Sequence, residues 1–192
     1  LRLLQQYNMK IHDMLNYWRG DLSMLNQYVF NDVNELIAHL MNKLDNPTPL
    51  KIQKSLYFLW AFYTATYGNI DYDVSENEFA QGTRYPKELF KAEFEAWRYG
   101  PVLNKVYAEN KSGQFDDLKD TWVPTTANEK EIYSFIDDLL VQINGVNDFG
   151  LVERSHQDHA WKIAFKGEDH CKMDNKQIKQ DYIGYVKQQA EF

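Results

Sequence analysis

Residues 94–107, FEAWRYGPVLNKVY, decide the fold, because they combine the pattern of a strand, a sharp turn and the start of a helix. Over 90–97, apolar residues alternate with largely charged ones, which is the period of a strand with unlike faces. Gly100 permits a left-handed backbone, and Pro101 suits the first turn of a helix. From Val102 the apolar spacing becomes helical. We therefore predict a strand, a turn at Gly100 and a helix from Val102.

Composition and charge limit the class of protein. With 192 residues, 44% hydrophobic and 26% charged, the chain suits one globular domain and a modest extension. A net charge of −7 disfavours a surface that follows phosphates, so nucleic acid is an unlikely partner. The single cysteine, Cys171, fits a reducing, cytoplasmic compartment. The longest apolar run, 56–63, is far shorter than the roughly 20 residues of a membrane-spanning helix.

The first thirty residues are predicted to form an N-terminal helical extension, and 31–192 the domain itself. Helical apolar spacing runs through 1–30, with a break at Gly20 and Asp21. Two interpretations stay open. The extension folds back on the domain, or it is an arm that forms a homodimer or contacts a partner.

The first two helices of the domain are predicted from their caps. Asp32 begins an amphipathic helix over 33–44 with the start of a capping box. Thr48 caps a helix over 50–67 that is apolar nearly all round, which is typical of a central, buried helix. Gly68 is predicted to end this helix in a left-handed conformation.

The remaining chain is predicted to hold two connectors and further helices. Residues 69–86 and 111–124 lack periodicity and are expected to be loops. A capping box at Thr126 begins a helix that Asn144 and Gly145 end. The segment 149–165 is predicted to form two short helices hinged at Ser155 and His156, with Ser155 or Asp158 as the second cap. A closing helix begins at Asp174. The predicted fold is mainly α: one compact helical domain with a short strand or hairpin before the GPV helix.

Two blocks of sequence resemble the Panacea domain, which occurs in prophage-borne proteins and in bacterial antitoxins. The family's first block reads close to LQKLLYF, and residues 52–58 read IQKSLYF. Its second block reads AWxxGPV, and residues 96–102 match it at every fixed position. The resemblance extends in order from 31 to about 187.

A third block of the family is a Thr-His pair followed by Pro-Trp. Here Ser155 replaces the threonine and Ala160 the proline, whereas His156 and Trp161 agree with the pattern.

The resemblance implies a mainly helical antitoxin of a two-gene toxin–antitoxin module. Such a protein binds a cognate toxin, encoded by a neighbouring gene, directly. Two alternatives stay open. One is an adaptor that delivers a partner to an ATP-dependent protease, and the other is a phage DNA-binding regulator. The helices show no basic recognition face, which disfavours the regulator.

Aromatic residues and arginine are the types that dominate binding hot spots. On this ground and on the family blocks, we predict a set of partner-binding residues around the second and third blocks. The alternative interpretation gives them roles in the turn and the core. They are Trp97, Arg98, Tyr99, Pro101, His156 and Trp161.

Neither a metal nor a cofactor is predicted. His156 and His159 share one helical face, but a zinc site needs three or four converging ligands and no second pair has suitable spacing. The sequence holds no phosphate-binding glycine loop, no nucleophile elbow and no HExxH. Cys171 and His170 are sequence neighbours, which seldom face each other as a catalytic pair does. We therefore expect a non-catalytic binding protein.

Overall fold

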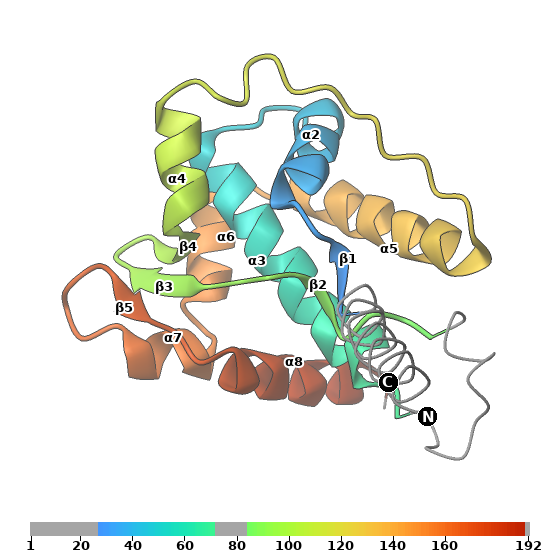
Figure 1. Ribbon diagram of the computed structural model, residues 1–192. Helices are drawn as coiled ribbons and strands as arrows, with labels where there is room; N and C mark the ends of the chain where they lie inside the picture. Colours follow the sequence, from blue (N-terminus) through green and yellow to red (C-terminus); the bar gives the residue numbers. More distant parts are fainter. Residues whose placement is uncertain (1–26, 72–83, 191–192) are drawn as a thin grey trace, which may run out of the picture.

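Helix α3 (Pro49–Ala65) lies at the centre of the molecule, as Figure 1 shows for the computed structural model, which describes residues 27–71 and 84–190. The Thr48 hydroxyl accepts a hydrogen bond from the Lys51 amide, as predicted for the cap, and Pro49 occupies the first turn. All but three of the 17 residues of α3 are buried. A helix that is apolar all round is stable only when other elements cover it on every side.

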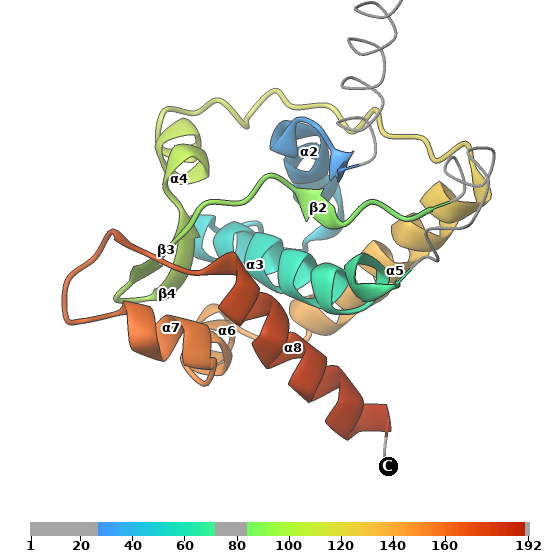
Figure 2. The ribbon, with the colours of Figure 1, turned by 60° about the horizontal axis from the view of Figure 1, so that its bottom comes forward.

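Six more helices of the described residues surround α3 or extend from its neighbours. Figure 2 shows α3 between α2 on one side and α8 on the other. The six are α2 (Val33–Lys43), α4 (Asn104–Lys111), α5 (Ala127–Asn144), α6 (Asp148–Ser155), α7 (His159–Ala164) and α8 (Asn175–Ala190). The mainly helical prediction is confirmed for the part of the chain that the structure describes.

Two small sheets complete the fold. The parallel pair of β1 (Tyr28–Phe30) and β2 (Glu88–Phe90) forms the first. The second is antiparallel, in the order β4-β3-β5, from β3 (Phe94–Trp97), β4 (Gly100–Leu103) and β5 (Cys171–Lys172). The single strand predicted over 90–97 is therefore two strands in different sheets. Its predicted buried face is confirmed, because Phe90, Ala92, Phe94 and Ala96 are all buried.

The predicted helix start at Val102 is wrong. Residues from Gly100 to Leu103 pair with β3, and α4 begins only at Asn104. The reason lies in α3: the Gln53 side chain accepts from the Leu103 amide (2.8 Å) and donates to the Leu103 carbonyl (3.3 Å). These bonds and the pairing with β3 hold the backbone extended, so Pro101 lies in a strand.

The predicted role of Gly68 is also wrong. Helix α3 ends at Ala65, and Gly68 lies in a short 3-10 turn, η1 (Tyr67–Asn69), without a positive φ. A Cβ at this position would lie 2.2 Å from the carbonyl oxygen of Lys87. The glycine is required by the close approach of the chain before β2, and not by a left-handed helix end.

The predictions for the later helices differ in outcome. Thr126 and Glu129 form the complete capping box of α5, as predicted. Helices α6 and α7 meet at a bend that begins at His156, also as predicted. Asp158 precedes α7, but its side chain forms no capping bond. Its carboxylate is instead a buried acceptor, described below.

The connector between α4 and α5 is attached to the body of the protein through a buried histidine. His39 of α2 is fully buried, and its ring nitrogens lie 2.7 Å from Asp120 Oδ2 and 2.8 Å from Asp137 Oδ1. Lys43 Nζ also donates to Asp137 (2.7 Å). Trp122, in the same connector, packs against Phe30 with ring centroids 4.7 Å apart. The predicted loop over 111–124 is therefore a fixed segment without regular structure.

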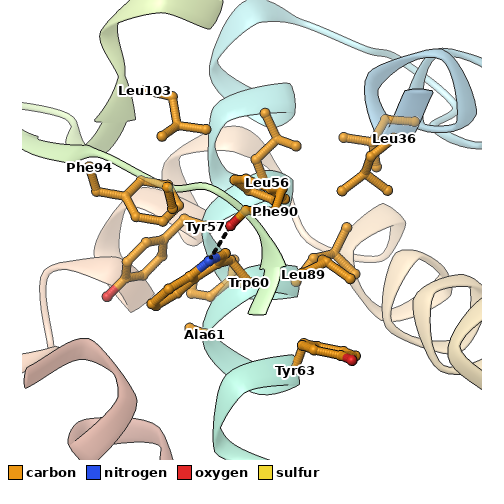
Figure 3. Close-up of a cluster of buried hydrophobic side chains, with 14 of the residues drawn as sticks. Leu36, Leu56, Tyr57, Trp60, Ala61, Tyr63, Leu89, Phe90, Phe94 and Leu103 are labelled. Atoms are coloured by element: carbon orange, nitrogen blue, oxygen red, sulfur yellow. Dashed lines mark hydrogen bonds between the residues drawn. The ribbon is translucent and has the colours of Figure 1, made fainter. Parts of the chain in front are cut away.

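The core is strongly aromatic, in keeping with the 15% of Phe, Trp and Tyr in the sequence. Figure 3 shows Trp60 of α3 among Tyr57, Phe90 and Phe94, with its indole Nε1 donating to the Phe90 carbonyl (3.0 Å). The rings of Tyr57 and Phe94 meet edge to face at 5.3 Å. Trp60 thus joins α3 to β2 of the first sheet, and Tyr57 joins α3 to β3 of the second.

Two further predictions concern segments that the structure describes only in part. Most of the extension, 1–26, and most of the acidic loop, 72–83, lie outside the described residues. The predicted homodimer arm therefore lies outside them too. No helix among the described residues is long and apolar enough to cross a membrane.

Candidate partner-binding groove at the β3–β4 hairpin

A groove with a volume of about 420 Å³ lies between the start of α3 and the turn of the β3–β4 hairpin. We call it the hairpin groove. Helix α3, the hairpin, α4 and the loop before β5 each contribute to it. Its lining residues are Pro49, Leu50, Gln53, Lys54, Trp97, Arg98, Tyr99, Val102, Tyr107, Gly167 and Asp169.

The hairpin turn presents two exposed side chains beside the groove. Trp97 pairs with Gly100, so Arg98 and Tyr99 form a two-residue loop. Gly100, the first residue after this loop, has φ +90°, a conformation that favours glycine. Arg98 is exposed, and Tyr99 keeps 54% of its surface exposed. The Arg98 amide donates to Asp169 Oδ1, which ties the turn to the loop before β5.

Trp97 lines the hairpin groove and packs against two other rings. Its ring centroid lies 5.1 Å from that of Tyr107 and 4.4 Å from that of His170. The Trp97 indole donates to Glu95 Oε2 (2.9 Å), and His170 Nδ1 lies 2.9 Å from the same oxygen. His170 also has φ +70°, which is uncommon for a residue other than glycine. The orientation of Trp97 is therefore set by contacts from three elements.

Lys54 is the most deeply buried residue that lines the groove, with 1% exposure. Its ammonium donates to the Pro101 carbonyl (2.8 Å), and it forms no ion pair with any acidic residue of 27–71 or 84–190. Burial lowers the pKa of Lys54 to about 7. Sequence reasoning assigned Lys54 no role. The sequence did offer one signal: this lysine lies in a helix that is apolar on nearly every face and is therefore expected to be buried.

Three predicted residues do not line the groove: Pro101 lies in β4, His156 lies at the bend after α6, and Trp161 lies in α7. The Trp161 indole donates to the Trp97 carbonyl (3.0 Å), and the rings of His156 and Trp161 stack at 3.8 Å. Burial lowers the pKa of His156, and the charge of Lys54 lowers it further. Pro101 is buried and accepts from Lys54. The predicted set therefore divides into Trp97, Arg98 and Tyr99 at the groove and three residues that support them.

A buried carboxylate fixes the helices that carry this support. Asp158 accepts from the hydroxyls of Tyr57 (2.7 Å) and Tyr182 (2.9 Å) and from Arg154 Nη1 (2.6 Å). These donors lie on α3, α8 and α6. Burial, followed by the neighbouring Tyr182 and Asp158, raises the pKa of Tyr57, so its hydroxyl stays protonated as a donor. Sequence reasoning missed this role of Asp158, because the two tyrosines are distant from it in sequence.

The chemistry of the groove suits recognition of a side chain. Leu50, Val102 and the rings of Trp97 and Tyr107 supply apolar surface, and Lys54 supplies a buried cation. No group of three or more potential metal ligands occurs among the residues that the structure describes. Fold and site together define a mainly helical domain with an aromatic groove at its hairpin.

One family has a sequence profile that matches this chain. Residues 77–162 match the family described as "Antitoxin SocA-like, Panacea domain". The resemblance to the Panacea domain is thereby confirmed over these residues, which include the AWxxGPV block and the third block but not residues 52–58. The comparisons with curated proteins and with solved structures gave no match.

Proposed function

We propose that this protein is an antitoxin that neutralises a toxin protein by binding it directly, without catalysis, through the hairpin groove. The family match supports a role in a toxin–antitoxin system, since the family is described as antitoxin-like. We choose this surface because of the position of the hairpin and its exposed side chains. It lies inside the matched segment, and it exposes Arg98 and Tyr99 beside the aromatic side of the groove.

Exposed aromatic and arginine side chains around a groove are the usual anchors of a protein interface. Tyr99 offers a rigid ring with a polar end, and Arg98 offers five donors. Their backbone is fixed by the hairpin, by Gly100 and by Asp169. A fixed surface lowers the entropy cost of association, which favours tight binding.

Co-expression with the protein encoded by the neighbouring gene tests this proposal. The intact chain is expected to relieve the growth arrest that the partner causes. Arg98→Glu combined with Tyr99→Ala is expected to abolish the relief, while circular dichroism and urea unfolding stay close to those of the wild type. Val123→Ser is the matched control, because Val123 is 73% exposed and lies in the connector that leads to α5. Relief that persists in the double variant contradicts the choice of surface.

The abundance of the partner distinguishes direct neutralisation from the adaptor alternative. Under direct binding, the amount of partner protein on an immunoblot stays constant or rises when the antitoxin is present. An adaptor for a protease would instead shorten the half-life of the partner. A fall in abundance that requires an ATP-dependent protease would replace direct neutralisation as the mechanism.

A further inference from the structure

We infer that the hairpin groove binds an apolar side chain of the partner that is accompanied by a carboxylate, and that Lys54 recognises this carboxylate. The inference rests on the proposed function and goes further, because it names the chemistry of the partner segment and the residue that selects it.

The charges around the groove are the first observation. Two cations, Lys54 and Arg98, line it together with a single acid, Asp169. One oxygen of Asp169 already accepts from the Arg98 amide. Neither cation forms an ion pair with a described acidic residue. In a chain with a net charge of −7, this groove is a local positive site, so it favours an acidic segment over a basic one.

The burial of Lys54 is the second observation. A buried ammonium without a counter-ion is unfavourable, because it has lost its water without gaining a negative charge. It has three donors, and the Pro101 carbonyl takes one of them. A carboxylate that enters the groove would supply the missing charge and accept a second hydrogen bond. Charge-assisted bonds of this kind are among the stronger ones in proteins.

The size and surface of the groove are the third observation. Its volume of about 420 Å³ is at the lower end of the range of ligand sites. Leu50, Val102 and Tyr107 offer apolar contacts, and Trp97 adds an aromatic face. One large apolar side chain and a neighbouring carboxylate, from an acidic residue or from a chain end, fit such a space.

Two small probes test the inference without the partner protein. The first is 3-phenylpropanoate, which carries a ring and a carboxylate, and the second is its amide, 3-phenylpropanamide, which has the same shape without the charge. Compounds of this size are expected to bind with a Kd on the order of 1 mM. In 15N-labelled protein at pH 6.5, the acid is expected to shift the amide signals of Arg98, Tyr99 and Val102. The amide is expected to bind about tenfold more weakly.

The variant Lys54→Met removes the charge and keeps the length of the side chain. In this variant the two probes are expected to bind equally, whereas the control Lys105→Met, an exposed lysine on α4, keeps the preference for the acid. Equal binding of the two probes by the wild type overturns the inference, and so does the absence of any shift at the groove with both compounds at about 10 mM, tenfold above the expected Kd.

Calorimetry distinguishes a direct contact between Lys54 and the carboxylate from a merely structural role of Lys54. Because a bound carboxylate raises the pKa of Lys54 from about 7, the protein is expected to take up a proton when 3-phenylpropanoate binds at pH 8. The proton uptake is measured from the dependence of the binding heat on the ionisation enthalpy of the buffer. It is expected to vanish in Lys54→Met. Proton uptake that persists in that variant assigns the carboxylate to another residue.

The outcomes separate this inference from the proposed function. A partner protein that is neutralised equally by wild type and Lys54→Met leaves direct neutralisation in place and overturns the role of Lys54. If the protein prefers the acid probe but fails to relieve growth arrest, the result supports the carboxylate site and contradicts the antitoxin proposal.

Discussion

At the scale of single residues, Gly100 shows how one backbone position determines the geometry of the hairpin groove. Its φ of +90° closes the turn, and it has no side chain where two others converge. A Cβ at this position would lie 2.4 Å from Ser155 Oγ and 2.8 Å from Lys54 Cε. The glycine therefore lets the hairpin lie directly against α3 and α6.

Gly100→Ala is expected to destabilise the protein by about 2 kcal/mol or more, because strain in the backbone adds to two steric clashes. Urea unfolding measures the change. Gly167→Ala is the matched control: Gly167 has φ +91°, but a Cβ there would meet no atom within 4 Å. The control carries the backbone strain alone, so an equal loss in both variants would contradict the steric role of Gly100.

Lys54 gives the stability of the protein a specific dependence on pH. Its pKa is about 7 in the folded protein and near 10.5 in the unfolded chain, so between these values the unfolded chain binds more protons. The free energy of unfolding is therefore expected to rise with pH from about 7 toward 9.5. Above that range the tyrosines of the unfolded chain begin to ionise. Lys54→Met is expected to remove most of the rise, which chemical denaturation at a series of pH values measures. A rise of equal slope in the variant would show that other groups cause it.

These two residues also show what sequence alone reveals. A glycine between a strand pattern and a proline predicts a turn, because the constraint is local, and the structure has that turn. Lys54 is important because the hairpin, nearly fifty positions away in sequence, buries it. The residues around Lys54 in the sequence do not reveal this burial.

At the scale of elements, the bend between α6 and α7 positions the residues that support the hairpin. Trp161 of α7 donates to the Trp97 carbonyl, and His156 at the bend stacks on Trp161. The bend itself is held by Asp158, which joins α3, α6 and α8 through three hydrogen bonds.

Asp158→Asn is expected to cost roughly 2 to 4 kcal/mol of stability, because it leaves Arg154 without its carboxylate in a half-buried site and weakens two tyrosine bonds. Urea unfolding followed by tryptophan fluorescence measures the loss. Glu109→Gln, at a pair with the exposed Lys105, is expected to change stability by less than about 1 kcal/mol. A loss in Asp158→Asn as small as that of the control would contradict the structural role of this network.

Helix boundaries were predictable where a cap is local and were missed where a distant residue decides. Thr48 and Thr126 cap α3 and α5 within one turn, and both starts agree with the prediction. The start of α4 is set by Gln53, and the requirement for glycine at position 68 by the approach of Lys87. Gln53 and Lys87 both lie outside the segments that they affect, so the sequence of those segments does not reveal their influence.

At the scale of the whole molecule, charge argues against the DNA-binding alternative. The net charge is −7, and the positive site at the hairpin groove is small and lined by apolar surface. We expect no retardation of a DNA fragment carrying its own promoter in a gel-shift assay at 50 mM salt, a condition that favours phosphate contacts. Binding that weakens steeply as salt rises would contradict this expectation and favour a regulator.

The overall architecture was predictable to the level of a mainly helical fold around one buried helix, because the apolar pattern of α3 has no exposed face. The pairing of β1 with β2 joins segments sixty residues apart and was not predictable from either one. The groove likewise arises from four separate elements, so the sequence predicted three of its residues and missed its buried cation.

The position of α3 has a consequence for the dynamics of the protein. Helices on several sides and both sheets contact it, so we expect no local opening to expose its backbone to solvent. Its amide hydrogens from Leu56 to Tyr63 are therefore expected to exchange with deuterium only when the domain unfolds globally, at a rate set by the global free energy of unfolding. Amides of the short helix α7 are expected to exchange through smaller fluctuations, and a slower exchange there than in α3 would contradict this hierarchy.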